Sequence, residues 1–277
     1  MTLKSLVRAL LPSLLLLTTT SGCRKASSSG TVAPPADLIW SDEFDGPAGT
    51  AANATRWKYE VGGSGWGNNQ LEYDTNRTSN AALDGAGHLV ITARAESYLG
   101  RNYTSARLNT NGLFSQAYGR FEARIQLPIG QGIWPAFWML GANIGQTPWP
   151  ACGEIDVMEM RGQSPTVILG SVHGPGYSGG ASLTSTYSLP SGTFHDGFHV
   201  FTVDWTPTKI EWRVDGNLYK VVTPSSLPSN GTWVFDHPFS ILLNLAVGGT
   251  FLGNPDASTV FPQSMIVDYV RVYRITA

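Results

Sequence analysis

Residues 119–127 read Gly-Arg-Phe-Glu-Ala-Arg-Ile-Gln-Leu, and their pattern carries the prediction of the fold class. Apolar side chains recur at every second position, and charged or polar side chains fill the positions between them. A period of two is the repeat of a β-strand that has one buried face and one solvated face. The segment therefore predicts a strand that packs against a core.

Short apolar segments elsewhere extend this prediction to most of the chain. Asp215-Gly216 separates two of them and predicts a tight hairpin turn. No segment shows a sustained helical period with helix caps. We therefore predict an all-β fold, a β-sandwich jelly roll of the concanavalin A-like kind with two packed antiparallel sheets. The other expected strands are 88–94, 200–205, 210–214, 218–222, 239–247 and 266–273.

The composition narrows the class of partner. The chain has 277 residues, with 31 Gly, 17 Pro and 9 Trp, and only 14% of its residues are charged. This suits an all-β protein with many turns and an aromatic surface on which sugars stack. The net charge is −2, which gives no electrostatic reason to expect nucleic acid or an anionic membrane surface as a partner.

Residues 1–22 look like a signal peptide. A basic start precedes the apolar run 9–17, which is too short to span a bilayer well. Ser-Gly before Cys23 resembles a bacterial lipoprotein cleavage site, although Thr20 stands where an aliphatic residue is usual. We expect an exported protein of the bacterial cell envelope with a lipid anchor at Cys23, and simple secretion is the alternative.

The rest of the chain reads as a tether followed by one domain. Residues 23–36 are rich in Ser and Pro and hold little to bury. Residues 37–277 then form the globular domain, within the size range of one β domain and expected to act as a monomer; the motifs described below make it the expected catalytic domain. If Cys23 is lipidated, Cys152 has no internal disulfide partner, and we expect it to be a small buried residue.

Residues 154–159 read Glu-Ile-Asp-Val-Met-Glu and carry the chemistry. In a strand Glu154 and Asp156 share one face, whereas Glu159 would point the other way. One extra residue in a β-bulge would return Glu159 to the same face. Mutual repulsion then raises at least one pKa. Two carboxyl groups in different protonation states are what glycoside hydrolysis requires; a calcium site or a solvated acidic edge is the alternative.

Two mechanisms fit such a carboxyl pair. In a retaining mechanism the two groups lie about 5–5.5 Å apart, and one attacks the sugar while the other protonates the leaving oxygen. An inverting pair, separated by about 6.5–9.5 Å, stays open from the residues alone. Asp156, between the two glutamates, can hydrogen-bond to one of them and hold its charge state.

The segment 153–159 resembles the catalytic signature of glycoside hydrolase family 16, in the bulged form similar to bacterial endo-β-1,3-glucanases called laminarinases. The resemblance covers about residues 38–275, with its motifs in order. It implies that Glu154 is the nucleophile, Glu159 the general acid/base and Asp156 an auxiliary acid. It also implies retaining, endo-acting hydrolysis of β-1,3-glucosidic bonds in laminarin-type β-glucans, with no cofactor for catalysis. The other motifs are Trp40-Ser-Asp-Glu-Phe44, Gly65-Trp-Gly-Asn-Asn-Gln-Leu-Glu-Tyr73, Gln116-Ala-Tyr-Gly-Arg-Phe-Glu-Ala-Arg124, Gly132-Ile-Trp-Pro-Ala-Phe-Trp-Met-Leu140, Leu243-Asn-Leu-Ala-Val-Gly-Gly249 and Val267-Asp-Tyr-Val-Arg-Val-Tyr273.

Tryptophans are the expected sugar platforms, because the apolar face of a pyranose stacks on an indole ring. The resemblance places Trp134 and Trp138 in the cleft, and Trp66 and Trp149 are further candidates. Core packing is the alternative for any single Trp. We expect Trp205 and Trp212 to be structural.

Polar side chains complete the expected substrate site. The resemblance places Asn69 and Arg107 at substrate contacts, where Asn69 binds sugar hydroxyls and Arg107 bridges a sugar and a catalytic glutamate. We expect His173 beside Glu159, where it would tune the pKa of that carboxyl; a core histidine is the alternative. Asp74 departs from the family pattern, in which many members have a second Tyr, and this affects outer subsites rather than the chemistry.

A structural calcium is a further expectation, since the family often holds one on the convex side of the fold. The resemblance points to backbone carbonyls near Glu43 and Gly87 and to the side chain of Asp268. A hydrogen-bonded residue at a strand edge is the alternative for Asp268.

Other functions stay open at this level. The same sandwich serves sugar-binding modules without catalysis, although such a module needs no paired acid and nucleophile. The same chemistry could act on mixed-linkage β-1,3-1,4-glucan or on a marine galactan. The bulged motif favours β-1,3-glucan.

The N-terminal prediction is tested by mass spectrometry of the mature protein purified from membranes. We expect the mature chain to begin at Cys23 and to carry the added mass of a lipid. An unmodified terminus beyond residue 23 would exclude the lipid anchor and leave simple secretion.

Overall fold

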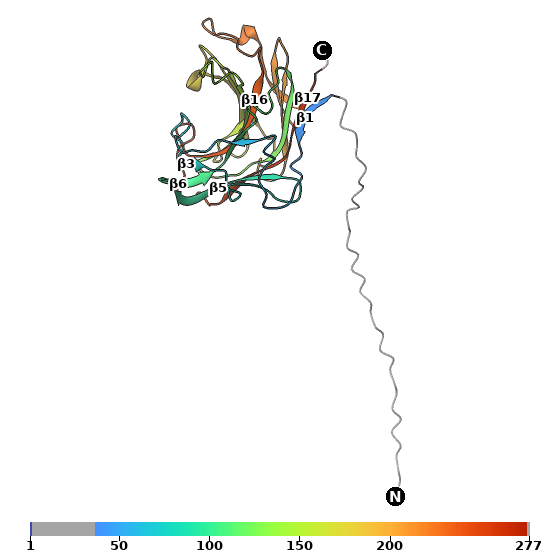
Figure 1. The fold of residues 1–277 in the computed structure, drawn as a ribbon, viewed down its shortest axis with the longest axis vertical. Helices are drawn as coiled ribbons and strands as arrows, with labels where there is room; N and C mark the ends of the chain where they lie inside the picture. The colour runs from blue at the N-terminus through green and yellow to red at the C-terminus, as the bar shows by residue number, and fades with distance from the viewer. Residues whose placement is uncertain (2–36, 276–277) are drawn as a thin grey trace. The chain divides into compact units, whose positions relative to one another are not determined.

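Two stacked β-sheets form the described part of the chain (Figure 1). The computed structural model describes residue 1 and residues 37–275. In the first sheet the strand order is β15 (Asn217–Val222), β14 (Ile210–Val214), β13 (His199–Trp205), β8 (Gly119–Gln126), β17 (Gln263–Tyr273), β5 (Leu89–Tyr98), β6 (Arg101–Ser105) and β3 (Glu72–Asp74), with β1 (Leu38–Asp42) paired to β17 and β4 (Ala81–Leu83) paired to β5. In the second sheet the order is β12 (Leu183–Ser188), β11 (Val167–His173), β10 (Glu154–Met160), β9 (Ile133–Gly141), β16 (Phe239–Val247), β7 (Arg107–Asn109) and β2 (Lys58–Tyr59).

The pairing confirms the predicted antiparallel sandwich, with one exception. All the paired strands run antiparallel in the described residues except β3 and β6, which are parallel. Figure 1 shows β5, β6 and β3 together at one edge of the first sheet, and β1 beside β17. The only helices in residues 37–275 are two short 3-10 turns, Gly179–Ala181 and Pro224–Ser226. None of the helices in the described residues is long and apolar enough to cross a membrane.

The predicted period of two is visible in the burial of β8. Phe121, Ala123 and Ile125 are fully buried, and the residues between them are partly exposed. The expected strands 210–214 and 239–247 coincide with β14 and β16. Asp215 and Gly216 join β14 to β15 with φ angles of 48° and 80°, which is the left-handed geometry of a tight hairpin turn.

The core lies between the two sheets and fixes which face of β10 is free. Ile155, Met158 and Met160 of β10 are fully buried in this core, so the opposite face of the strand points away from it. Trp205 and Trp212 are also fully buried, as expected for structural residues. Cys152 is a buried free cysteine, and burial raises the pKa of its thiol to about 11.

The predictions for the N-terminal region lie outside the described residues. They concern the signal peptide beyond residue 1, Cys23 and the tether 23–36. The described residues 37–275 fall within one compact unit, Pro35–Ala277.

The three residues predicted to bind calcium lie close together, but Asp268 is already paired. A Cβ on Gly87 would lie 3.9 Å from the carbonyl oxygen of Glu43, so backbone oxygens of the kind that calcium prefers are present. The carboxylate of Asp268 lies 2.5 Å from Arg124 Nη1 and 3.8 Å from His88 Nε2. Arg124 contacts only Oδ2 of Asp268, so Oδ1 is still open to a cation and calcium at these three residues stays a prediction.

A chelator tests this assignment. Because a bound ion stabilises the folded state, we expect excess EDTA to lower the melting temperature and added calcium to restore it. A melting temperature that EDTA leaves unchanged would argue against calcium at this site.

Candidate active site

The β-bulge in β10 lies where the spacing of the acids predicts it. Asp156 pairs with Ser171 on β11, and Glu159 pairs with Leu169, so three steps along β10 match two along β11. The register with β9 shifts at the same place, between Asp156 and Met158. The extra residue returns Glu159 to the face of Asp156.

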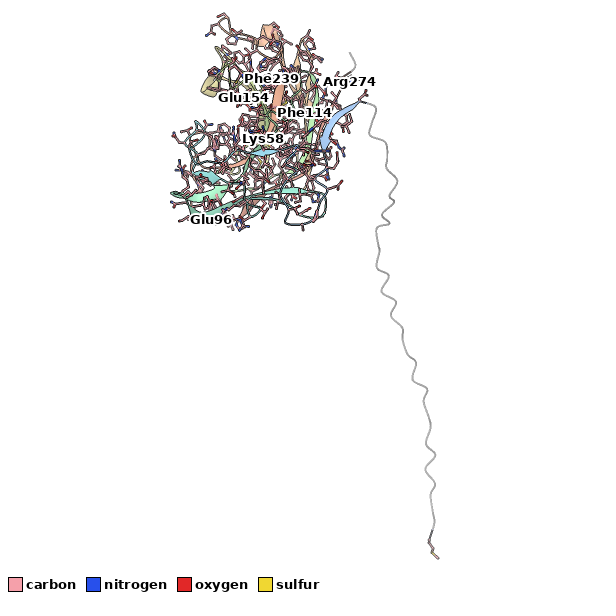
Figure 2. The ribbon with its side chains drawn as sticks, in the orientation of Figure 1. Lys58, Glu96, Phe114, Glu154, Phe239 and Arg274 are labelled. Atoms are coloured by element: carbon pink, nitrogen blue, oxygen red, sulfur yellow. The ribbon has the colours of Figure 1, made fainter. Side chains whose placement is uncertain are left out.

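The strand register shows which side chains share this outward face. Residues directly opposite each other in an antiparallel ladder point to the same side of the sheet. Glu154 itself lies within the body of the domain (Figure 2). The face gathers most of the residues that the sequence predicts: Glu154, Asp156 and Glu159 of β10, Trp134 and Trp138 of β9, Arg107 of β7 and His173 of β11, together with Asn244 of β16.

Glu154 and Glu159 each accept a hydrogen bond from one tryptophan. Trp149 Nε1 donates to Glu154 Oε2 at 2.6 Å, and Trp134 Nε1 donates to Glu159 Oε1 at 3.0 Å. Trp149 is 44% exposed, whereas Trp134 is only 7% exposed and packs on Phe251 with ring centroids 4.6 Å apart. Trp149 is therefore an open stacking surface at the acids, and Trp134 acts mainly as a hydrogen-bond donor.

The surroundings separate the protonation states of the two glutamates. Burial and then the charge of Asp156 raise the pKa of Glu154. Burial, the charge of Asp156 and the charge of Glu154 together raise the pKa of Glu159 well above its usual value. The pKa of Glu154 rises to about 8 and that of Glu159 rises further, so Glu154 ionises before Glu159. This order gives the nucleophile and the acid that the reaction requires.

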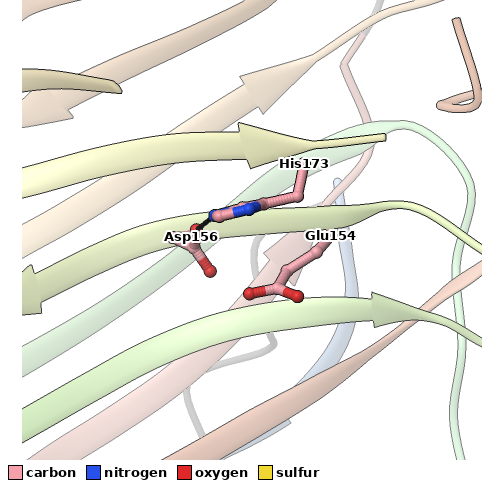
Figure 3. A group of neighbouring side chains, drawn as sticks. All are labelled: Glu154, Asp156 and His173. Atoms are coloured by element: carbon pink, nitrogen blue, oxygen red, sulfur yellow. Dashed lines mark ion pairs between the residues drawn. The ribbon is translucent and has the colours of Figure 1, made fainter. Parts of the chain in front are cut away.

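His173 contacts Asp156 rather than Glu159, which corrects the expected contact, but its charge does lower the pKa of Glu159, as expected. In the register it lies opposite Glu154, and its Nε2 is 3.0 Å from Asp156 Oδ2. Figure 3 shows the ring directed at the Asp156 carboxyl, with Glu154 alongside. Side-chain atoms of these three residues lie within 4.8 Å of one another.

Two effects oppose each other at the His173 ring. Burial alone would lower its pKa, but contact with Asp156 and the charges of the acids raise it to about 9. Gly179 N–H, however, donates to Nδ1 at 3.1 Å, and this bond needs an unprotonated Nδ1. While that bond persists, the ring is neutral and carries its proton on Nε2.

Arg107 pairs with Glu60 rather than with a catalytic glutamate, which corrects its expected role. Its guanidinium lies between two indole rings, 4.7 Å from the centroid of Trp66 and 4.7 Å from that of Trp138. The side chain is 11% exposed. Arg107 therefore holds two of the expected platforms in place by cation–π contacts.

The loop before β3 carries two of the other expected substrate residues. Asn69 is exposed and Trp66 partly exposed, and both have left-handed backbones with φ angles of 55° and 48°. Trp66 Nε1 donates to Asp74 Oδ2 at 2.8 Å, and Asp74 is 2% exposed. The residue that departs from the family pattern thus fixes the Trp66 ring.

Sequence reasoning did not identify Asn244 or Glu60 as members of the site. Trp138 Nε1 donates to Asn244 Oδ1 at 2.7 Å. A signal for Asn244 was present, because it is an amide inside the apolar run 239–247 and a buried amide needs a partner. Glu60 lies far from Arg107 in the sequence and gives no local signal.

Comparisons with known proteins agree with this geometry. Residues 65–270 match the family described as glycosyl hydrolases family 16. The chain belongs to this family. It is therefore a glycoside hydrolase of the all-β sandwich type, as the sequence predicts.

Individual relatives cover nearly the whole domain. The chain is 43% identical to the β-glucanase of Rhodothermus marinus over 94% of this chain and 93% of that protein. Among solved structures, the laminarinase catalytic domain of Thermotoga maritima is similar, with a TM-score of 0.82, 47% identity and coverage of 87% of this chain and 98% of that one. The endo-β-1,3-glucanase of Pyrococcus furiosus also has a TM-score of 0.82, with 49% identity and coverage of 87% and 95%.

The two indole hydrogen bonds predict opposite effects on the pH profile. Each N–H stabilises a carboxylate and so lowers the pKa of its glutamate. Trp149→Phe should raise the pKa of Glu154 and move the acidic limb of kcat/KM to higher pH. Trp134→Phe should raise the pKa of Glu159 and move the alkaline limb to higher pH. Steady-state rates across the pH range measure both limbs, and a shift of the same limb in both variants would contradict the assignment.

Proposed function

We propose that this family 16 enzyme hydrolyses internal β-1,3-glucosidic bonds of laminarin-type β-glucans with retention of configuration. The observation that carries the proposal is the bulged β10. It puts Glu154, Asp156 and Glu159 on one face and leaves the proton on Glu159. Similar proteins from Thermotoga maritima and Pyrococcus furiosus, a laminarinase and an endo-β-1,3-glucanase, support the choice of substrate.

Each acid has one role in this reaction. Glu159 protonates the glycosidic oxygen while Glu154 attacks the anomeric carbon and forms a covalent glycosyl-enzyme. Glu159 then removes a proton from water, which releases the sugar and restores the Glu154 carboxylate. Asp156 lies against the His173 ring, and its charge raises the pKa of Glu159.

Aromatic surfaces lie on both sides of the acids along the sheet. Trp149 contacts Glu154 on one side. On the other side, Trp138 of β9 and Trp66 enclose Arg107. A glucan that crosses the strands would meet an indole before and after the acids, which supports endo action on a polymer.

Three further properties are proposals from the sequence. They are export with a lipid anchor at Cys23 or simple secretion, a monomeric domain, and independence from any cofactor for catalysis.

Replacement of the two glutamates tests the proposed function. Glu159→Gln should lower the release of reducing ends from laminarin by about 10²–10⁴-fold, because the leaving oxygen is no longer protonated. Glu154→Gln should reduce it to background. The matched control is Glu122→Gln, which changes a carboxyl of the first sheet that accepts a hydrogen bond from Tyr269, and it should keep the wild-type rate. Wild-type rates in either catalytic variant would refute the assignment.

The products of the reaction also report its stereochemistry and the polymer that the enzyme prefers. Proton NMR of early products should show the β anomer first, since a double displacement retains configuration. An α anomer would show a single displacement by water. Faster release from mixed-linkage glucan or agarose than from laminarin would change the substrate without changing the chemistry.

A further inference from the structure

Two buried side chains of the first sheet contact the second sheet around the bulge, one on β10 and one on the neighbouring strands. Trp212 of β14 is fully buried, and its Nε1–H donates to the carbonyl oxygen of Asp156 at 2.8 Å. Lys220 of β15 is 6% exposed, and its Nζ donates to the carbonyl oxygen of Gly170 at 2.8 Å and to that of Leu183. Gly170 lies in β11 between the partners of Asp156 and Glu159, so it faces the bulge.

The bulge explains why these donors are needed. An extra residue interrupts the hydrogen-bond ladder and leaves backbone groups without strand partners. The carbonyl groups of Asp156 and Gly170 in the second sheet accept hydrogen bonds from side chains of the first sheet. They therefore point into the space between the two sheets. Water does not reach that space, so an unpaired carbonyl there costs free energy. Trp212 and Lys220 supply the missing donors on β10 and on β11.

The space around Gly170 is fitted to the same contact. A Cβ at this position would lie 2.3 Å from Tyr219 Oη and 2.6 Å from Trp212 Cδ1, so only glycine leaves room for the indole. Lys220 Nζ lies 4.5 Å from the centroid of the Trp212 ring and adds a cation–π contact. We call Trp212, Lys220 and Gly170 the bulge-contact residues.

We propose that the bulge-contact residues are positioning residues for catalysis, because they hold β10 in the bulged register that keeps Glu159 beside Glu154. In a regular register Glu159 would turn toward the core. The inference rests on the proposed role of Glu159 as the acid/base. A misplacement of about 1 Å in a reacting group can cost about 10²-fold in rate, so a small relaxation of the bulge would be visible in kcat.

Trp212→Phe tests the proposal, with Trp205→Phe as its matched control. Both indoles are fully buried, and both donate Nε1–H to a backbone carbonyl; the acceptor of Trp205 is Phe235, at 3.2 Å and outside β10. We expect Trp212→Phe to lower kcat on laminarin by about 10–100-fold with KM changed less than about 2-fold. Trp205→Phe should keep most of kcat. Melting temperatures of both variants separate this loss from a loss of folded protein.

A rescue assay distinguishes a misplaced Glu159 from general damage. The probe is a 2,4-dinitrophenyl β-laminaribioside with added azide. Dinitrophenolate leaves without protonation, and azide displaces Glu154 from the anomeric carbon without a base, giving a glycosyl azide and the free carboxylate. The activity lost in Trp212→Phe should return under these conditions, as it should in Glu159→Gln.

The outcomes separate the proposal from its premise. If Glu159→Gln is rescued and Trp212→Phe is not, or if Trp212→Phe loses no more kcat than Trp205→Phe, positioning by the bulge-contact residues is refuted. If Glu159→Gln itself is not rescued, the role of Glu159 is wrong and the proposal falls with it. If Trp212→Phe does not fold, Lys220→Met keeps the aliphatic chain, removes the donors to Gly170 and Leu183, and carries the same expectations.

Discussion

One extra residue in β10 is the constraint on which the catalytic face depends. Side chains of a strand alternate, so a segment with Glu154, Asp156 and Glu159 cannot present all three on one face in a regular register. The bulge removes this conflict and keeps Ile155, Met158 and Met160 in the core. The one extra residue therefore lets β10 direct three acids outward while its apolar side chains stay in the core.

The electrostatics of the face follow from this crowding. Burial and mutual repulsion disfavour three ionised carboxyls and raise the pKa of Glu154 and of Glu159, and one indole hydrogen bond to each lowers that pKa by a smaller amount. Indole N–H groups contact Glu154 and Glu159, and the His173 ring contacts Asp156. Since Glu159 faces the charge of both other acids, it is the group that retains a proton. The distribution of charge is thus a property of the cluster and not of any one residue.

The sequence predicts the features that depend on the local repeat of apolar and polar residues. It does not predict contacts between segments that are far apart in the chain. The alternation in 119–127 and the odd spacing in 154–159 predict strands, a buried face and the bulge, because these follow from strand geometry alone. Segments such as 200–205, 210–214 and 239–247 are predicted nearly to their ends for the same reason. The ion pair of Arg107 with Glu60, the contact of His173 with Asp156 and the burial of Trp134 depend on which strands become neighbours. No local pattern holds that information, and the family resemblance places these residues at the cleft without giving their partners.

Gly170 and its two neighbours from the other sheet also bear on how this site can evolve. A lineage that lost one residue from β10 would move the Asp156 carbonyl away from the Trp212 N–H, whereas Lys220 would keep the Leu183 carbonyl of β12 as an acceptor. A buried N–H without an acceptor costs about 1–3 kcal/mol. Loss of the bulge is therefore favoured by a substitution of Trp212, so the length of β10 and the identity of a residue in β14 are expected to change together.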